Sequence, residues 1–421
     1  MRQWSRIIET ISEKVILIGI QSSNGDDANE SLEELKELAK TAGAETVGMV
    51  IQSREYVHPS TYIGTGKLME VKDLIYEKGA TGVICDDELT PTQMKVLSDE
   101  LDTKVMDRTV LILDIFAQRA STAEGKIQVE LAQLRYSMTR LAGYGNSMSR
   151  LGGGIGTRGP GETKLETDRR VIRNRISGLK EELKEVVRHR ETTRKSRERN
   201  NIPVVAIVGY TNAGKSTLLN KLTASEVYSE DKLFATLDPT TRSYKLSSGQ
   251  EILLTDTVGF INKLPHHLVD AFKSTLEEAK YADIILHLVD SSNPAAANQM
   301  EVVYETLHNL NVEEKPVITL FNKCDIKNDD MILKDVRAEK TFVVSAKTGA
   351  GLTDFVKALE DILRQDKLFF EGILAFKDAG ILQLIRQGGE LISEEYTENG
   401  IEVKAYVTKR IYGMLTKNDR L

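Results

Sequence analysis

The sequence predicts an α/β protein of several domains, and three observations support this prediction. The chain has 421 residues, which is too long for one ordinary hydrophobic core and favours two to four domains. Short apolar runs alternate with helical patterns in residues 14–110 and again in residues 201–365, as in parallel α/β domains. Two long helical patterns of heptad type lie between these regions. We therefore expect four parts, residues 1–111, 112–200, 201–365 and 366–421.

The first part, residues 1–111, is expected to be a small parallel α/β domain. The pattern predicts strands at 15–20, 46–51 and 82–85, with helices at 29–42, 66–78 and 90–101. The run Tyr62-Ile-Gly-Thr-Gly-Lys67 opens one of these helices, so a phosphate group could bind there. A tight turn at a helix start is the alternative, because the full G-x-G-x-x-G spacing is absent.

The second part, residues 112–200, is expected to be an antiparallel helical hairpin. Apolar residues recur at steps of four and three in both arms, which predicts a packing seam. The seam residues are Ile127, Leu131, Leu134, Met138 and Leu141 in the first arm, and Val171 or Ile172, Ile176, Leu179, Leu183 and Val186 in the second.

The loop between the two arms, residues 151–162, is unusually rich in glycine. Six glycines fall between Gly152 and Gly161, and Arg150 and Arg158 accompany them. Such a loop cannot build its own core, but it can approach another surface with bare backbone and two guanidinium groups. A flexible linker is the alternative interpretation.

The third part, residues 201–365, begins with a phosphate-loop motif. The run Gly209-Tyr-Thr-Asn-Ala-Gly-Lys-Ser216 fits G-x-x-x-x-G-K-[ST] and lies between an apolar stretch and a helical pattern, the context that this motif requires. Its backbone amides can face phosphate oxygens, Lys215 can reach the β- and γ-phosphates, and the Ser216 hydroxyl can ligate Mg²⁺. The predicted phosphate-binding residues are Gly209, Tyr210, Thr211, Asn212, Ala213, Gly214, Lys215, Ser216 and Thr217.

Two later segments are expected to contact the γ-phosphate. In the first, Asp256-Thr257-Val258-Gly259, the carboxylate can hold Mg²⁺ through water and the Gly259 amide can bond the γ-phosphate. In the second, Phe234-Ala235-Thr236-Leu237-Asp238, the Thr236 hydroxyl can bind the same metal. An ordinary turn is the alternative role for Thr236, because loop threonines are common turn formers.

The base is predicted to be guanine. The run Asn322-Lys323-Cys324-Asp325 directly follows an apolar strand pattern. A carboxylate there can accept hydrogen bonds from the ring N–H and the amino group of guanine, whereas adenine offers no such pair. We expect Asn322 to tie this loop to the phosphate loop and the stem of Lys323 to lie over the base. The run Ser345-Ala346-Lys347 supplies a third turn that faces the base.

The expected chemistry is GTP hydrolysis that is slow in the isolated protein. Many GTPases orient the attacking water with a glutamine directly after D-x-x-G, but Phe260 stands there in this chain. One candidate to complete the site is Asn212, which resembles an asparagine that helps to hold K⁺ in K⁺-activated GTPases; a turn-forming role is the alternative. Arg242 is a competing candidate, with surface exposure as its alternative. The predicted catalytic residues are Lys215, Asn212, Thr236 and Gly259.

Charge and hydropathy suggest a partner and a compartment. The net charge is −7, yet residues 164–199 carry thirteen Lys and Arg against seven Asp and Glu. A cationic arm on an acidic chain favours RNA as a partner. We expect a cytoplasmic protein, because no apolar run reaches membrane-spanning length and the first residues lack a signal peptide's apolar core. The last part, residues 366–421, is expected to be a small α+β module with a hairpin around 398–400.

Taken together, the nucleotide motifs resemble those of translation-factor-class P-loop GTPases. Residues 151–162 and 62–67 narrow the resemblance to the HflX family of ribosome-associated GTPases. That resemblance implies a protein that is partly ribosome-associated and is stimulated by the ribosome. It also implies ATP binding by the N-terminal domain, as in some members. The residues implied to contact rRNA of the large (50S) subunit are Arg150, Gly153, Gly154, Arg158 and Gly159.

The expected partners are therefore the 50S subunit, GTP and GDP, with ATP at the N-terminal domain, and Mg²⁺ and K⁺ are the candidate cofactors. Nothing in the sequence demands more than a monomer. The alternative hypothesis is a GTPase switch that controls a protein partner, such as a membrane protease, through the helical hairpin.

Overall fold

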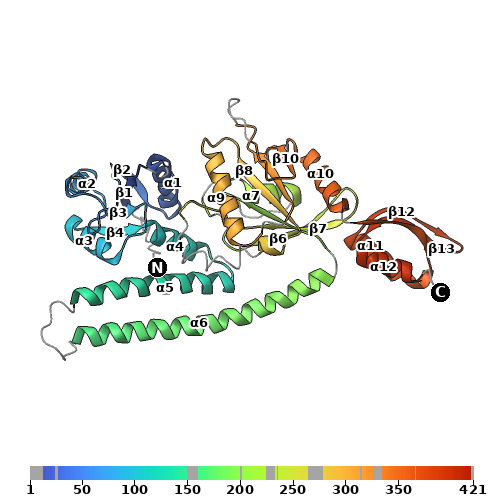
Figure 1. Cartoon of the computed structure of the whole chain (residues 1–421), viewed down its shortest axis with the longest axis horizontal. Helices are drawn as coiled ribbons and strands as arrows, with labels where there is room; N and C mark the ends of the chain where they lie inside the picture. The colour runs from blue at the N-terminus through green and yellow to red at the C-terminus, as the bar shows by residue number, and fades with distance from the viewer. Residues whose placement is uncertain are drawn as a thin grey trace, which may run out of the picture. The chain divides into compact units, whose positions relative to one another are not determined.

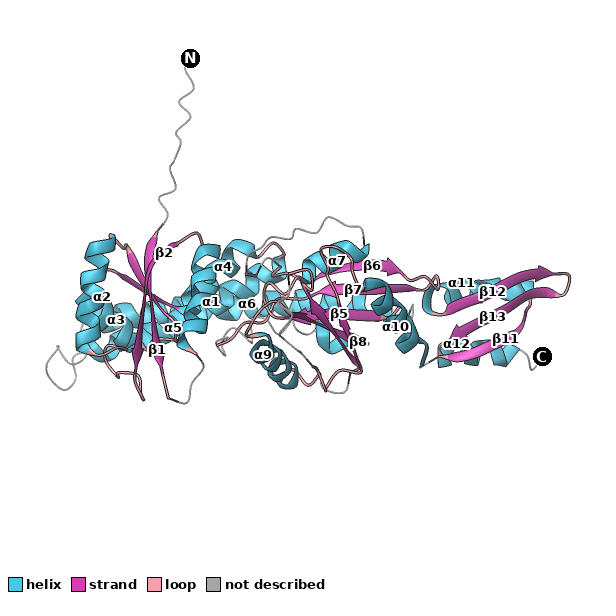
Figure 2. Cartoon of the chain, turned by 90° about the horizontal axis from the view of Figure 1, so that it is seen from above, coloured by secondary structure: helices cyan, strands magenta, loops and turns pink. Residues whose placement is uncertain are grey.

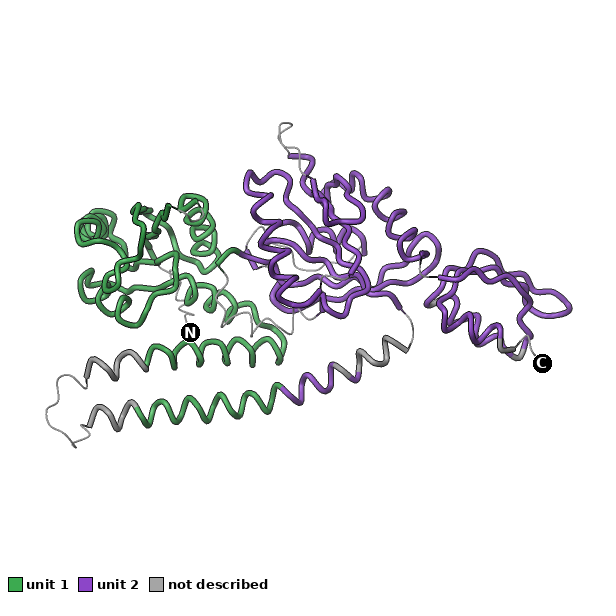
Figure 3. The backbone as a smooth tube through the Cα atoms, in the orientation of Figure 1, with its two compact units in different colours: residues 1–183, 262–271 green, residues 184–261, 272–421 purple. Residues whose placement is uncertain are grey.

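The chain forms two compact units, residues 1–183 with 262–271 and residues 184–261 with 272–421 (Figure 3). The computed structural model describes residues 13–23, 27–148, 160–199, 202–223, 233–234, 236–263, 278–312, 315–326, 334–365 and 367–418. None of the helices in this described part combines the length and the hydrophobicity that crossing a bilayer takes.

The first unit contains a four-stranded parallel sheet of order β2-β1-β3-β4. Figure 2 shows α2 and α3 on one face of this sheet and α1 and α4 on the other. The strands are β1 (Lys14–Gln21), β2 (Glu45–Ser53), β3 (Gly82–Cys85) and β4 (Lys104–Asp107). The helices are α1 (Ala28–Thr41), α2 (Thr65–Lys78), α3 (Pro91–Leu101) and α4 (Arg108–Arg119). The predicted parallel α/β fold is confirmed.

Strand β4 and helix α4 were not predicted from the pattern. They meet without an intervening loop, because Asp107 both ends β4 and caps α4, its carboxylate accepting a hydrogen bond from the amide of Val110. A four-residue strand that runs directly into a helix offers no glycine or proline boundary to mark it in the sequence.

The predicted helical hairpin consists of α5 (Ala123–Met148) and α6 (Pro160–Arg199), which run side by side (Figure 1). Leu131, Ile176 and Leu179 are buried in the seam between them. Ile172 packs against this seam, whereas Val171 is 60% exposed, so Ile172 is the seam residue of the two alternatives. Helix α6 begins at Pro160, so residues 160–162 are helical rather than part of the predicted loop, and residues 149–159 lie outside the described part.

The second unit contains a six-stranded sheet of order β10-β9-β8-β5-β7-β6, in which only the β6–β7 pair is antiparallel. Its strands are β5 (Val204–Gly209), β6 (Thr240–Lys245), β7 (Glu251–Asp256), β8 (Ile284–Asp290), β9 (Val317–Asn322) and β10 (Lys340–Val343). Its described helices are α7 (Lys215–Thr223), α9 (Ala296–Asn309) and α10 (Leu352–Gln365). Apolar side chains of β5, β7, β8 and α10 form the core. The predicted motifs follow the carboxyl ends of parallel strands, where open α/β sheets bind their ligands.

The C-terminal residues of the second unit form a separate small core. Its three antiparallel strands have the order β11-β13-β12. The elements are β11 (Leu368–Leu374), the 3₁₀ turn η1 (Phe376–Asp378), α11 (Ala379–Gly388), β12 (Glu390–Thr397), β13 (Gly400–Val407) and α12 (Lys409–Asn418). The expected α+β module with a hairpin is confirmed, and α12 is an addition that the sequence did not predict.

Candidate nucleotide-binding site

The predicted nucleotide-site residues gather at one edge of the six-stranded sheet. Four of the five predicted segments follow the carboxyl end of a parallel strand: 209–217 after β5, 256–259 after β7, 322–325 after β9 and 345–347 after β10. The fifth segment, residues 234 and 236–238, precedes β6. Ala235, one of the predicted residues, lies outside the described part of the chain.

The phosphate loop wraps around the ammonium group of Lys215. This group donates hydrogen bonds to the carbonyl oxygens of Gly209, at 3.1 Å, and Tyr210, at 2.8 Å. Burial lowers the pKa of Lys215 to about 8, and the nearby carboxylate of Asp256 partly opposes this shift. The cation is therefore held at the sheet edge by the loop that is predicted to bind phosphate.

Asn322 links the phosphate loop to the base-reading loops. Its side-chain amide donates to the carbonyl oxygen of Ala213 at 2.8 Å, and its side-chain oxygen accepts from the amide of Ala346 at 2.8 Å. Gly214 makes room for this link, since a β-carbon there would lie only 2.5 Å from Nδ2 of Asn322 and its φ is +96°. This is the tie between the loops that the sequence predicted.

The three predicted metal ligands lie together. Oγ of Ser216 lies 2.8 Å from Oγ1 of Thr236 and donates to Oδ2 of Asp256 at 2.7 Å. Asp256 is fully buried, and its other oxygen, Oδ1, has no hydrogen-bond partner in the described part of the chain. Burial raises the pKa of Asp256, and Lys215 and Ser216 oppose this shift. An all-oxygen set with an unsatisfied carboxylate oxygen fits Mg²⁺.

The D-x-x-G segment packs directly against the phosphate loop. The amide of Phe260 donates to the carbonyl oxygen of Gly209 at 3.1 Å, and the amide of Thr211 donates to the carbonyl oxygen of Phe260 at 2.8 Å. The Phe260 side chain is only 2% exposed. The residue that replaces the usual glutamine is therefore an apolar packing residue.

The base-reading loop presents an ionised carboxylate. A hydrogen bond from Ser345 is the main reason that the pKa of Asp325 is lowered. Lys323 adopts a φ of +64°, and its ammonium group lies 2.7 Å from Oδ2 of Asp290 at the end of β8. The sequence analysis missed Asp290, although a carboxylate that closes a buried strand beside the phosphate loop is a recognisable signal.

Asn212 and Arg242, the two residues that could take the place of the missing catalytic glutamine, lie in different parts of the unit. Asn212 lies within the phosphate loop with a φ of +61°, a region in which asparagine is common for conformational reasons. Arg242 is exposed on β6 and donates to the carbonyl oxygen of Thr241, which agrees with the surface alternative. The predicted rRNA contacts Arg150, Gly153, Gly154, Arg158 and Gly159 lie outside the described residues.

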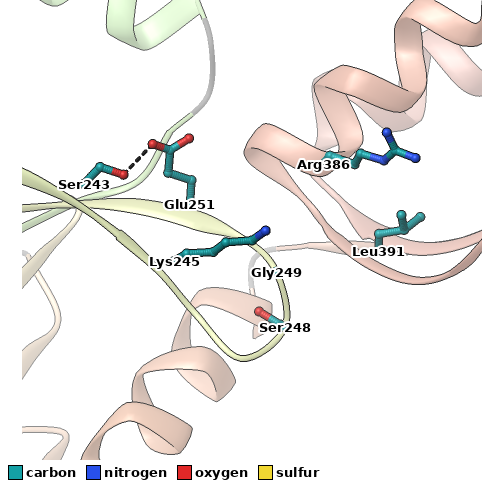
Figure 4. A pocket seen from close by; sticks show the side chains of 7 residues that line it. All are labelled: Ser243, Lys245, Ser248, Gly249, Glu251, Arg386 and Leu391. Atoms are coloured by element: carbon teal, nitrogen blue, oxygen red, sulfur yellow. Dashed lines mark hydrogen bonds between the residues drawn. The ribbon is translucent and has the colours of Figure 1, made fainter. Parts of the chain in front are cut away.

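A hollow of about 560 Å³ lies elsewhere in the same unit (Figure 4). Its walls come from the β6–β7 hairpin and from the C-terminal module. The residues are Ser243, Lys245, Ser248, Gly249, Glu251, Arg386 and Leu391. Ser243 donates to Glu251, and Arg386 pairs with Glu394. Because none of the predicted nucleotide-site residues lines it, this hollow is separate from the nucleotide site.

Comparisons with known proteins bear on the whole chain. Three protein-family models match, described as GTP-binding GTPase N-terminal over residues 29–117, GTP-binding GTPase middle region over 119–197, and 50S ribosome-binding GTPase over 204–323. The GTPase HflX of Lacrimispora saccharolytica is 59% identical over 411 residues, which cover 98% of this chain and 97% of the relative. The chain belongs to the HflX family of GTPases.

A second relative and one solved structure are also similar to this chain. The HflX GTPase of Caldanaerobacter subterraneus subsp. tengcongensis is 51% identical, with coverage of 95% of this chain and 92% of the relative. A crystal structure of SsGBP with GDP is 26% identical at a TM-score of 0.48 and covers 83% of this chain and 98% of that chain. The oxygen set of Ser216, Thr236 and Asp256 is of the kind that Mg²⁺ prefers.

Proposed function

We propose that the protein is a Mg²⁺-dependent GTP hydrolase whose nucleotide state controls its binding to the 50S ribosomal subunit. The observation that carries this proposal is the grouping of Ser216, Thr236 and Asp256 beside the phosphate loop, with Gly259 packed against that loop. The family description of residues 204–323 as a 50S ribosome-binding GTPase supports the choice of partner.

Substrate binding would use contacts at both ends of the nucleotide. Asp325 accepts two hydrogen bonds from guanine, while the loop amides and Lys215 bind the phosphates. Ser216 and Thr236, together with Asp256 through water, would hold Mg²⁺, which would supply positive charge against the β- and γ-phosphates. After hydrolysis Gly259 loses its contact with the γ-phosphate and Thr236 its contact with the metal beside it, so their segments relax and the affinity for the ribosome falls.

The intrinsic rate is proposed to be low. Hydrolysis transfers the γ-phosphoryl group to water, and that water must lie in line with the bond that breaks. Phe260 is buried and apolar, so it supplies neither a proton acceptor nor an orienting hydrogen bond. We propose that docking on the ribosome completes the site and raises the rate.

A monovalent cation is a second means of completing the site. The position of Asn212 within the phosphate loop supports K⁺ binding, although its positive φ alone accounts for an asparagine. Hydrolysis rates measured in equal concentrations of K⁺ and Na⁺ decide this point, since equal rates would exclude a specific K⁺ site.

The N-terminal ATP site gains little support. Helix α2 begins at Thr65 after Gly64, but Lys67 pairs with Glu70 at 2.9 Å. The Tyr62 hydroxyl donates to Asp87, a carboxylate that would repel a triphosphate. We therefore expect the variant Lys215→Ala to lose ATP hydrolysis together with GTP hydrolysis, and ATP turnover that survives would support a separate site.

The decisive test is co-sedimentation with separated ribosomal subunits in a GTP analogue, in GDP and without nucleotide. We expect the GTP analogue to give the highest occupancy of the large subunit, and deletion of residues 152–161 to reduce it. Equal occupancy in all three conditions would contradict the proposal. Binding to another partner that persists in several hundred millimolar salt would favour the protein-partner alternative.

A further inference from the structure

Thr211 carries a buried hydroxyl group that the described part of the chain does not satisfy. The residue is 7% exposed, and its Oγ1 has no hydrogen-bond partner in the described part of the chain. A buried hydroxyl without a partner lowers the stability of the folded protein, whereas valine would fill the same volume without that cost. The hydroxyl therefore points to a partner that arrives with a ligand.

The surroundings of Thr211 identify where that ligand group would lie. A β-carbon placed on Gly259 would lie 2.8 Å from both Cα and Cγ2 of Thr211, and 3.0 Å from Nζ of Lys215. The Thr211 side chain and the Lys215 ammonium group thus approach one point from two sides. Rotation about the Cα–Cβ bond brings Oγ1 to the place of Cγ2. An anionic oxygen held by Lys215 is therefore within reach of the hydroxyl.

The same geometry selects one phosphate. Gly259 belongs to the D-x-x-G segment, whose amide bonds the γ-phosphate in GTPases of this type, so the shared point lies at the γ end of the nucleotide. We infer that the Thr211 hydroxyl donates a hydrogen bond to the γ-phosphoryl group of GTP, a contact that GDP cannot make. This inference rests on the proposed function, since it requires GTP in the phosphate loop.

The hydrogen bond from Thr211 to the γ-phosphoryl group would also favour hydrolysis. Negative charge is spread over the equatorial oxygens of the γ-phosphoryl group in the transition state, and donors placed there beforehand stabilise it. Because Phe260 contributes no polar group, the Thr211 hydroxyl adds a donor on the side of the site where the usual glutamine is missing.

The test compares two substitutions that separate the hydroxyl from the shape of the side chain. Thr211→Val removes the hydroxyl and keeps the volume, and Thr211→Ser keeps the hydroxyl. Affinities for GDP and for a GTP analogue, and the single-turnover rate of GTP hydrolysis, are measured with Mg²⁺. For Thr211→Val we expect about a tenfold loss of GTP-analogue affinity and of rate, the low end for a hydrogen bond to a charged group, with unchanged GDP affinity. Thr211→Ser should stay close to the wild type.

Thermal stability separates this role from a structural one. The nucleotide-free Thr211→Val protein should melt at or above the wild-type temperature, because an unsatisfied hydroxyl has been removed. The matched control is Thr255→Val, which removes a buried hydroxyl that already has a partner, Oγ1 of Thr241 at 3.0 Å. That control should lower the melting temperature and leave the ratio of GTP-analogue to GDP affinity unchanged.

Two results would overturn the inference: equal losses of GDP and GTP-analogue affinity in Thr211→Val, or a wild-type hydrolysis rate in that variant. Failure of the proposed function looks different. In that case the wild-type protein itself would bind no guanine nucleotide or would prefer adenosine nucleotides.

Discussion

Asp325 is the residue on which base selection is proposed to depend. Its carboxylate is exposed beside Ser345, whose hydrogen bond keeps the pKa low, so it is an ionised acceptor at neutral pH. We expect Asp325→Asn to weaken GDP binding by about a hundredfold or more, because two hydrogen bonds to a charged group are lost. The amide of the variant can instead donate to the extra carbonyl of xanthine.

Binding titrations of GDP and of xanthosine diphosphate to the wild type and to Asp325→Asn measure whether the preferred base changes from guanine to xanthine. Xanthosine diphosphate should bind the variant more tightly than GDP does. Undiminished GDP affinity in the variant would show that the base is read elsewhere.

The lowered pKa of Lys215 predicts that nucleotide affinity depends on pH. Its pKa in the nucleotide-free protein is lowered to about 8 by burial. Bound phosphates favour the charged ammonium form and raise this pKa again. GDP affinity should therefore be constant below about pH 8 and fall as the pH rises above it, with proton uptake on binding.

Calorimetry in two buffers of different ionisation enthalpy between pH 7 and 9 measures that proton uptake. Lys215→Arg is the control, because a guanidinium group stays charged over the whole range. Affinity that is flat across this range in the wild type would contradict a lowered pKa.

At the scale of elements, the helical hairpin depends on a narrow apolar seam. Leu179 of α6 is 1% exposed in this seam, whereas Val171 of the same helix is 60% exposed. We expect Leu179→Ala to destabilise the α5–α6 pair by about 2–4 kcal/mol and Val171→Ala by less than about 0.5 kcal/mol. Amide hydrogen exchange on the full chain reports this as exchange about thirtyfold or more faster in α5 and α6. Similar protection in the two variants would mean that the seam does not hold the helices together.

Elements differ in how far the sequence predicts them. The apolar runs at 204–208, 252–254 and 316–321 coincide with the strands β5, β7 and β9 of the six-stranded sheet. Strand β4 has only four residues and passes directly into α4, so it gains its identity from pairing with β3 rather than from its own composition.

At the scale of the whole molecule, the two arginines of the glycine-rich loop predict how binding to the ribosome responds to salt. If Arg150 and Arg158 each contact a phosphate, replacing both by alanine should weaken binding of the GTP-analogue complex to the large subunit. The slope of log affinity against log salt concentration should become shallower by about two.

Co-sedimentation over a series of potassium acetate concentrations provides the slope. Replacing Arg169 and Arg170, two arginines of the cationic stretch in α6, removes the same charge and measures how much of the slope that stretch contributes. A slope that stays unchanged in the loop variant would remove these two arginines from the rRNA contacts.

The class of protein and the chemistry of its ligand can be predicted from local sequence motifs. The phosphate loop, the D-x-x-G segment and the Asn322–Asp325 run are contiguous, and each one's function depends mainly on residues that are neighbours in the chain. The same holds for the seam of the hairpin, since its periodicity is a property of one helix at a time.

Which of these segments meet follows only from the folded chain. The fold joins Asn322 to Ala213 and Ala346, brings Ser216, Thr236 and Asp256 within hydrogen-bond distance, and places Thr211 beside Gly259, with no partner for its hydroxyl among the described residues. These contacts join residues from about 20 to more than 100 positions apart, and they depend on strand order and loop path. Neither is encoded in a local pattern, because pairing between distant strands is a property of the folded core as a whole.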